Sequence, residues 1–225
     1  MMKLFGATLA AASLLTSVTA MAADYPAPRQ GDWTLKNFAF HTGETMPELK
    51  MHYTTVGEPS GQPVLVLHGT GGSAASMLTP AFGGELFGAG QPLDAAKYYV
   101  IIPDSVGHGG SSKPSDGLKT AFPKYDYAAM VDAQYRRVTE GLGVRHLRLV
   151  LGNSMGGMQA WLLGVHHPES LSALVPMACQ PPPTSSPHSS VPRPPGGRTP
   201  AHPGRDRSRP TPRPRAPTPG PTPAR

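Results

Sequence analysis

The chain has 225 residues and a formal net charge of +6. Two stretches of it differ from a folded domain: residues 1–22 have the pattern of an export signal, and residues 181–225 hold 16 of the 28 prolines. The remaining residues, 23–180, suffice for one domain with an apolar core, and a second globular domain is excluded.

The positive charge belongs almost wholly to the last 45 residues. These contain eight arginines and one acidic residue, Asp206, so they carry +7 and leave −1 for the rest of the chain. A folded part so close to neutral argues against nucleic-acid binding. Because Cys179 is the only cysteine, an intrachain disulfide and cysteine-pair metal sites are excluded. No metal or cofactor is implied.

The N-terminus predicts a secretory signal peptide. Lys3 precedes the apolar run Leu4–Ala12, and Ala20 and Ala22 supply the small residues that signal peptidase requires. We therefore expect cleavage after Ala22 and a periplasmic or secreted product. The apolar run is broken at Ser13 and falls short of the about 20 residues that a membrane-spanning helix needs.

Six segments predict strands. The first two alternate apolar and polar residues and are expected to form an antiparallel pair. The other four are short aliphatic runs between turn residues, which is typical of buried parallel strands. In chain order the segments are residues 33–40, 50–56, 64–67, 99–102, 147–151 and 173–177.

Helical segments separate the later strands. Residues 127–142 place Val131, Tyr135 and Val138 on one apolar face, with Asp126 as a candidate N-cap. Strands that alternate with helices predict an α/β architecture with a largely parallel sheet.

The chemistry of the chain centres on a turn between a strand and a helix. The strand at 147–151 runs into Gly152–Gly157, which contains the pattern G-x-S-x-G of a nucleophile elbow, and an apolar helix follows. The turn brings the positions two before and two after Ser154 into contact, so both are glycine. Ser154 is the candidate nucleophile, and the helix start directs the backbone N–H of Met155 at a developing oxyanion.

A second glycine-rich loop supplies a further oxyanion donor. Residues 68–72 follow the predicted strand at 64–67, and the N–H of Gly69 or Thr70 is the candidate. A phosphate-binding loop is the alternative, but the Gly-Lys-Ser/Thr that would complete one is missing.

Three motifs carry a resemblance to a known family: Gly152–Gln159, Pro103–Ser112 and His68–Gly69. Over roughly residues 30–180 the chain resembles the α/β-hydrolase superfamily, and more closely its homoserine O-acetyltransferase-like branch. The resemblance implies an α/β-hydrolase fold and a small-molecule ester or related acyl substrate. Hydrolysis is the first expectation. Acyl transfer, or a non-catalytic binding protein that uses its Pro/Arg-rich tail, stays open.

The family's acid and histidine are missing from the expected places. In this fold they follow later strands than the nucleophile does, and only the strand at 173–177 comes after Ser154. We therefore expect an incomplete sheet with an exposed edge. His166 and His167 are expected about 18 Å along the helix, on its solvent side. His68 and His108 are expected to be structural, and a role of His108 as a substitute base is the less favoured alternative.

The C-terminal residues cannot build the missing part. Residues 181–225 use nine residue types and include no Leu, Ile, Met or aromatic residue. Such a segment is expected to be disordered with polyproline II character. It is either a functional arm or the product of a reading-frame shift near Gln180. In both cases little or no catalytic turnover is expected of the chain as written.

Overall fold

The computed structural model describes residues 24–181. The expected signal peptide lies outside this range, as does the expected tail except for Pro181. No helix in the described range is long and apolar enough to cross a membrane.

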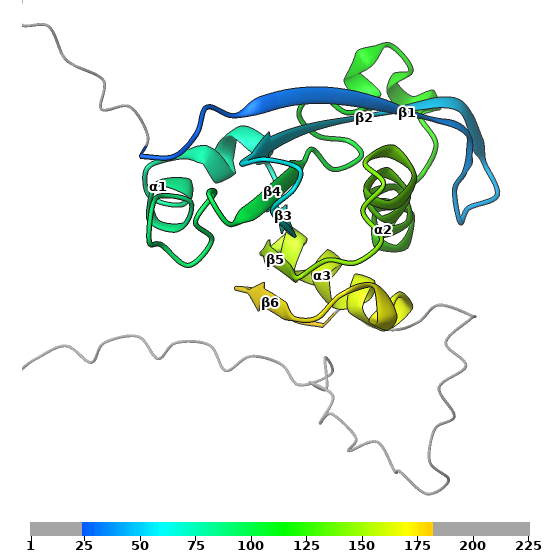
Figure 1. Cartoon of the computed structure of the whole chain (residues 1–225). Helices are drawn as coiled ribbons and strands as arrows, with labels where there is room; N and C mark the ends of the chain where they lie inside the picture. The colour runs from blue at the N-terminus through cyan, green and yellow to red at the C-terminus, as the bar shows by residue number, and fades with distance from the viewer. Residues whose placement is uncertain (1–23, 182–225) are drawn as a thin grey trace, which may run out of the picture. The chain divides into compact units, whose positions relative to one another are not determined.

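A six-stranded mixed sheet forms the centre of the fold (Figure 1). Its spatial order is β1-β2-β4-β3-β5-β6. β1 and β2 pair with their neighbours in antiparallel fashion, and the remaining pairs are parallel. This is the mostly parallel α/β-hydrolase arrangement that the sequence predicts. The strands are β1 (Arg29–Ala39), β2 (Thr45–Val56), β3 (Gln62–Leu67), β4 (Tyr98–Pro103), β5 (Leu149–Asn153) and β6 (Leu174–Met177).

Two helical layers cover the sheet. Alternate residues of a strand point to opposite faces, and in β3 Val64 and Val66 join a different apolar cluster from Leu65 and Leu67. The first cluster packs under the 3₁₀ turn η1 (Ala74–Leu78) and the short helix α1 (Gly83–Leu86). The second packs under α2 (Tyr127–Arg136) and α3 (Met155–His166), so α1 and α2 lie on opposite sides of β3 and β4 (Figure 1).

The helix predicted over residues 127–142 is shorter than expected. Asp126 is its N-cap, as predicted, and accepts a hydrogen bond from the N–H of Ala129 at 2.8 Å. The α-helix ends at Arg136, and the π-helical turn η4 (Arg137–Gly141) follows. The predicted apolar face is present although the α-helix gives way to a π-helical turn, because Val138 on this turn is buried in the same cluster as Val131.

All six predicted strands differ from the observed strands at one or both ends, and the last two do so beside the edge of the sheet. The fifth begins at Leu149 rather than Leu147, which forms only an isolated bridge to Leu171, and it extends through Asn153. At β6, Val150 donates its N–H to Ala173 and Ser154 donates to Met177. The backbone hydrogen-bonding groups of residues 173, 175 and 177 thus face β5. Those of residues 174 and 176 face the outer side of β6, where no strand of residues 24–181 pairs.

The π-helical turn buries an arginine. The side chain of Arg137 is fully buried, and none of its three nitrogens has a hydrogen-bond partner among the described residues. Its guanidinium carbon lies 4.9 Å from the centre of the Tyr53 ring. Burial lowers the pKa of Arg137 to about 10, an effect that the nearby Tyr53 and Tyr99 only partly oppose.

We expect Arg137→Met to stabilise the fold. A pKa below that of the unfolded chain means that the protonated side chain disfavours folding at pH 7, and that this penalty is relieved only as the pH rises above about 10. Methionine fills a similar volume without the buried charge, so the free energy of unfolding should rise by about 1–3 kcal/mol after the loss of the cation–π contact. Urea denaturation at pH 7 measures it.

The neighbouring Arg136 provides the matched control. It pairs with Glu140 at the surface, and Arg136→Met should change the stability by less than about 1 kcal/mol. A clear loss of stability in Arg137→Met alone would show that the buried guanidinium has a stabilising partner.

Candidate active site

Ser154 lies in a strained turn between β5 and α3. Its backbone has φ 52° and ψ −113°, a conformation that costs a non-glycine residue about 1–3 kcal/mol. Two hydrogen bonds hold the turn: the N–H of Ser154 donates to the carbonyl of Met177 at 2.9 Å, and its own carbonyl accepts from Met158 at 3.1 Å. The nucleophile elbow predicted from G-x-S-x-G therefore has the required strand-turn-helix setting.

The glycines around Ser154 are required by close backbone contacts. A Cβ atom on Gly152 would overlap the carbonyl group of Gly156, and one on Gly156 would overlap the carbonyl group of Leu67. These are the two positions that the sequence places in contact. Gly157 meets Cys179 and the carbonyl of Met177. Its close contact is therefore with the end of β6 and the residues after it, rather than with the central strands.

The loop after β3 approaches the elbow. A Cβ atom on Gly69 would lie 3.5 Å from the Cβ of Ser154 and 3.5 Å from the carbonyl oxygen of Asn153. No hydrogen bond within residues 24–181 uses the N–H of Gly69 or Thr70. Met155 is the first residue of α3, where N–H groups have no partner inside the helix. Free backbone donors thus flank Ser154 on two elements, and their assignment as oxyanion donors stays a prediction.

A buried polar network supports the loop after β3. His68 is completely buried; its Nδ1 lies 2.8 Å from the carbonyl oxygen of Gly69, and its Nε2 accepts from the N–H of Ser105 at 3.0 Å. The hydroxyl of Ser105 lies 3.4 Å from Nε2 of Gln134 and 3.3 Å from Nε2 of Gln159. Burial lowers the pKa of His68 and, to a lesser extent, so does the nearby His108. The structural role expected for His68 agrees with these contacts.

Asp104 joins the loops after β3 and β4, and sequence reasoning did not single it out. Its carboxylate is almost fully buried and accepts hydrogen bonds from the N–H groups of Ala74 and Gly110, both at 2.6 Å. Gly109, at φ 50°, has no room for a Cβ beside this carboxylate. The available signal was the position of Asp104 directly after β4, at the sheet edge where ligands of α/β proteins bind.

The remaining histidines do not reach the nucleophile. No hydrogen bond of the described residues involves the Ser154 hydroxyl. His108 stands at the same sheet edge, with its ring centre 5.2 Å from that of His68 and its Nδ1 3.1 Å from the carbonyl of Val106. His166 is exposed as expected, but His167 is half-buried and stacks on Tyr135 at 3.6 Å. Its expected solvent position was wrong, because α2 packs against the end of α3 and covers it.

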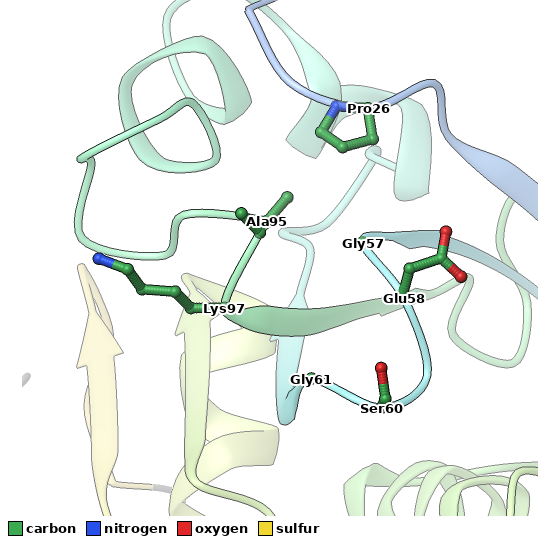
Figure 2. A pocket seen from close by; sticks show the side chains of 8 residues that line it. Pro26, Gly57, Glu58, Ser60, Gly61, Ala95 and Lys97 are labelled. Carbon is green, nitrogen blue, oxygen red and sulfur yellow. The ribbon is translucent and has the colours of Figure 1, made fainter.

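Two cavities in the described part of the chain have linings that do not include Ser154. One cavity of about 300 Å³ is lined from the loop between β2 and β3 and from the segment before β4 (Figure 2). These segments precede β3 and β4, whereas Ser154 follows β5, and the three strands run parallel. The cavity therefore lies at the N-terminal ends of these strands, and Ser154 lies at their C-terminal ends. The lining includes Glu58, Ser60 and Lys97. Residues 24–181 contain no group of three or more metal-ligating side chains.

Comparison with known proteins places the chain in a sequence family. The family described as alpha/beta hydrolase fold matches residues 62–220. A probable acyltransferase of Methanothermobacter thermautotrophicus is 32% identical over 151 residues, which are 64% of this chain and 46% of the relative. A homoserine O-acetyltransferase of Haloferax volcanii is 35% identical over 158 residues, which are 62% of this chain and 38% of the relative. The chain thus spans less than half the length of these relatives.

Solved structures agree on the fold. An acetylester hydrolase from Corynebacterium glutamicum has a TM-score of 0.61 at 22% identity, over 68% of this chain and 44% of that protein. A homoserine O-acetyltransferase from Staphylococcus aureus has a TM-score of 0.56 at 24% identity, over 66% of this chain and 46% of that protein. At these identities the likeness concerns the fold alone.

Proposed function

The chain belongs to the α/β hydrolase fold family, and on that premise we propose that its folded part is the nucleophile-bearing half of an acyl-transfer enzyme. Ser154 attacks the carbonyl of an ester or related acyl bond in a small-molecule substrate. The observation that carries this proposal is the strained backbone of Ser154 at the start of α3, with φ 52°. A protein keeps such strain where function requires the side chain to stand clear of the sheet.

The surroundings of Ser154 suit the charge that acyl transfer develops. Attack of the hydroxyl converts the substrate carbonyl into a tetrahedral oxyanion, and preorganised N–H donors stabilise it. Met155 supplies one donor from the start of α3, and Gly69 or Thr70 supplies the other from the loop after β3. The proton of the attacking hydroxyl must pass to a base, and no side chain of residues 24–181 accepts it in a hydrogen bond.

Hydrolysis and acyl transfer differ only in the acceptor of the acyl group. The curated relatives include homoserine O-acetyltransferases and a serine O-succinyltransferase, which favours an amino-acid hydroxyl as the alternative acceptor. Export favours water, because acyl-CoA donors belong to the cytoplasm. In a chain extended by the C-terminal part that its relatives carry, the ratio of free acid to O-acylhomoserine formed from one acyl donor separates the two activities.

Covalent labelling tests the nucleophile directly. A fluorophosphonate at high concentration should modify Ser154 before the other serines of residues 24–181, because backbone N–H groups without a hydrogen-bond partner flank Ser154 on two elements. The reaction should be slow without a base. Peptide mapping by mass spectrometry locates the label, and Ser154→Ala and Ser105→Ala are the matched variants, since Ser105 is a buried serine of the same region. Equal labelling of several exposed serines would contradict the proposal.

The proposal includes export of the mature chain. When the full chain is expressed in a bacterium, we expect the periplasmic product to begin at Ala23, because Ala20 and Ala22 fit the requirements of signal peptidase. Intact-mass analysis measures the N-terminus. Ala22→Phe places a bulky residue at the cleavage position and should leave the uncleaved chain. A wild-type product that retains residues 1–22 would refute the assignment.

A further inference from the structure

A second cavity lies between the end of β1, the helix α2 and the residue that follows α3. Its volume is about 360 Å³, and its polar lining consists of Asn37, Asp132, Tyr135, Arg136 and His167. We propose that this cavity binds a free α-amino acid with a polar, uncharged side chain. Binding there requires no reaction at Ser154 and is independent of the proposed function.

The cavity lies at the opposite end of α3 from the nucleophile. Ser154 directly precedes this helix, and His167 directly follows it. The 12 residues of α3 span about 18 Å at 1.5 Å for each residue. The lining includes no residue of the elbow or of the loop after β3. A ligand in this cavity is therefore remote from the hydroxyl of Ser154.

Two opposite charges on α2 border the cavity. Asp132 and Arg136 lie four residues apart, so they share one face of the helix. Oδ2 of Asp132 lies 2.8 Å from Nε2 of His41. Arg136 donates to Glu140 through Nε and Nη2, at 2.8 and 3.1 Å. Within residues 24–181 no hydrogen bond uses Oδ1 of Asp132 or Nη1 of Arg136, so both charged groups keep free hydrogen-bonding capacity.

An α-amino acid is complementary to this pair of charges. Its carboxylate accepts from Nη1 of Arg136, and its ammonium group donates to Oδ1 of Asp132. A ligand with a single charge would be attracted by one of the two side chains and repelled by the other. Because the side chains of Asp132 and Arg136 are 39% and 37% exposed, water weakens each contact. Binding therefore requires both contacts together.

The imidazole of His167 offers a polar contact for the ligand side chain. Its Nε2 is buried and has no hydrogen-bond partner within residues 24–181. Burial lowers the pKa of His167, and the opposing carboxylates of Asp132 and Glu169 do not outweigh it, so the ring is neutral at pH 7. The ring is stacked on Tyr135 at 3.6 Å. A half turn of the ring keeps this stack and exchanges Nε2 with Cε1, and we expect a ligand amide to bind the nitrogen there.

Asn37 brings a second amide to the cavity. Its φ of 50° is unusual for a non-glycine residue within a strand. The pairing of β1 with β2 joins Lys36 to Glu48 and Phe38 to Met46, but it has no partner for Asn37. An amide has both donors and an acceptor, so it can pair with the amide of a ligand side chain and with either tautomer of an imidazole. Glutamine is therefore the amino acid to test first.

Titration of the full chain with L-glutamine, followed by calorimetry and by nuclear magnetic resonance, tests the site. We expect saturable binding with a dissociation constant of about 1 mM or below, and shifted resonances at Asn37, Asp132 and His167. N-acetyl-L-glutamine lacks the ammonium group, the α-amide of L-glutamine lacks the carboxylate, and L-norleucine lacks the side-chain amide. Each should bind at least about threefold more weakly. Failure to saturate, equal binding of all four compounds, or shifts confined to the elbow would overturn the proposal.

Protein variants test the contacts from the other side. Arg136→Met removes the partner of the carboxylate and should weaken L-glutamine binding about tenfold or more. His167→Phe keeps an aromatic ring on Tyr135 but removes the nitrogen, and Asn37→Gly tolerates the positive φ but removes the amide. Each of these should weaken binding about three- to tenfold.

Arg145→Met is the matched control for Arg136→Met. Arg145 is exposed and does not line the cavity, so its replacement should leave the dissociation constant unchanged. Equal losses in the two arginine variants would indicate general charge attraction and overturn the proposal. Binding of L-glutamine to Arg136→Met with the affinity of the wild type would do the same. The analogue series in the wild-type chain requires no substitution, so it decides the question even if a variant fails to fold.

Discussion

The purified chain should hydrolyse p-nitrophenyl acetate no faster than its Ser154→Ala variant does. A serine hydroxyl is a weak nucleophile at neutral pH until an adjacent base removes its proton. In a serine protease whose triad was dissected by substitution, loss of the serine or the histidine lowers kcat by about 10⁶-fold, and about 10³- to 10⁴-fold acceleration over water remains from the oxyanion hole and binding. Any residual activity of this chain should therefore come from the oxyanion hole and from substrate binding.

The absorbance of released p-nitrophenol measures both proteins under the same conditions. A chain extended in frame with a C-terminal part that supplies an acid and a histidine serves as the positive control, and its activity should disappear in Ser154→Ala. Robust turnover by the chain as written, lost in Ser154→Ala, would refute the expectation and show that a base exists within it. His108 would then be the first residue to replace, because it lies at the same sheet edge as the nucleophile.

Gly156→Ala should abolish stable folding of residues 24–181 or lower the free energy of unfolding by more than about 4 kcal/mol. The added methyl group would overlap the carbonyl of Leu67, and it would lie 2.8 Å from the carbonyl oxygen of His68. Both obstacles are backbone atoms at the end of β3, which cannot rotate away as a side chain can. The only relief is to move α3 from the sheet, and that exposes the core that α3 shares with β3 and β5.

Urea denaturation followed by circular dichroism measures this effect. Gly84→Ala is the matched control, because a Cβ at Gly84 would have its closest contact at an ordinary 3.7 Å from Pro80. This control should change the stability by less than about 1 kcal/mol. If Gly156→Ala retained nearly the stability of the wild type, the close approach of α3 to β3 would be wrong, and the elbow would need another geometry.

The sequence by itself determined the features that depend on local patterns. Alternation of apolar and polar residues identified β1 and β2, and short aliphatic runs identified the four other strands. The nucleophile turn could be predicted because the residues that it requires lie close together in the sequence: glycine at positions 152 and 156, and a serine between them. The N-cap at Asp126 was readable for the same reason, since its bond to Ala129 spans three residues.

Only the tertiary structure decided which distant residues meet. The network from His68 through Ser105 to Gln159 joins segments separated by 37 and 54 residues, and no local pattern encodes such a pairing. The same holds for Asp104, whose carboxylate joins two loops, and for Arg137, whose burial follows from the packing of η4 against the sheet. From the sequence alone a polar side chain is predicted to be exposed, because its burial usually costs free energy. Packing and specific hydrogen bonds override that tendency, and both arise only once the sheet has formed.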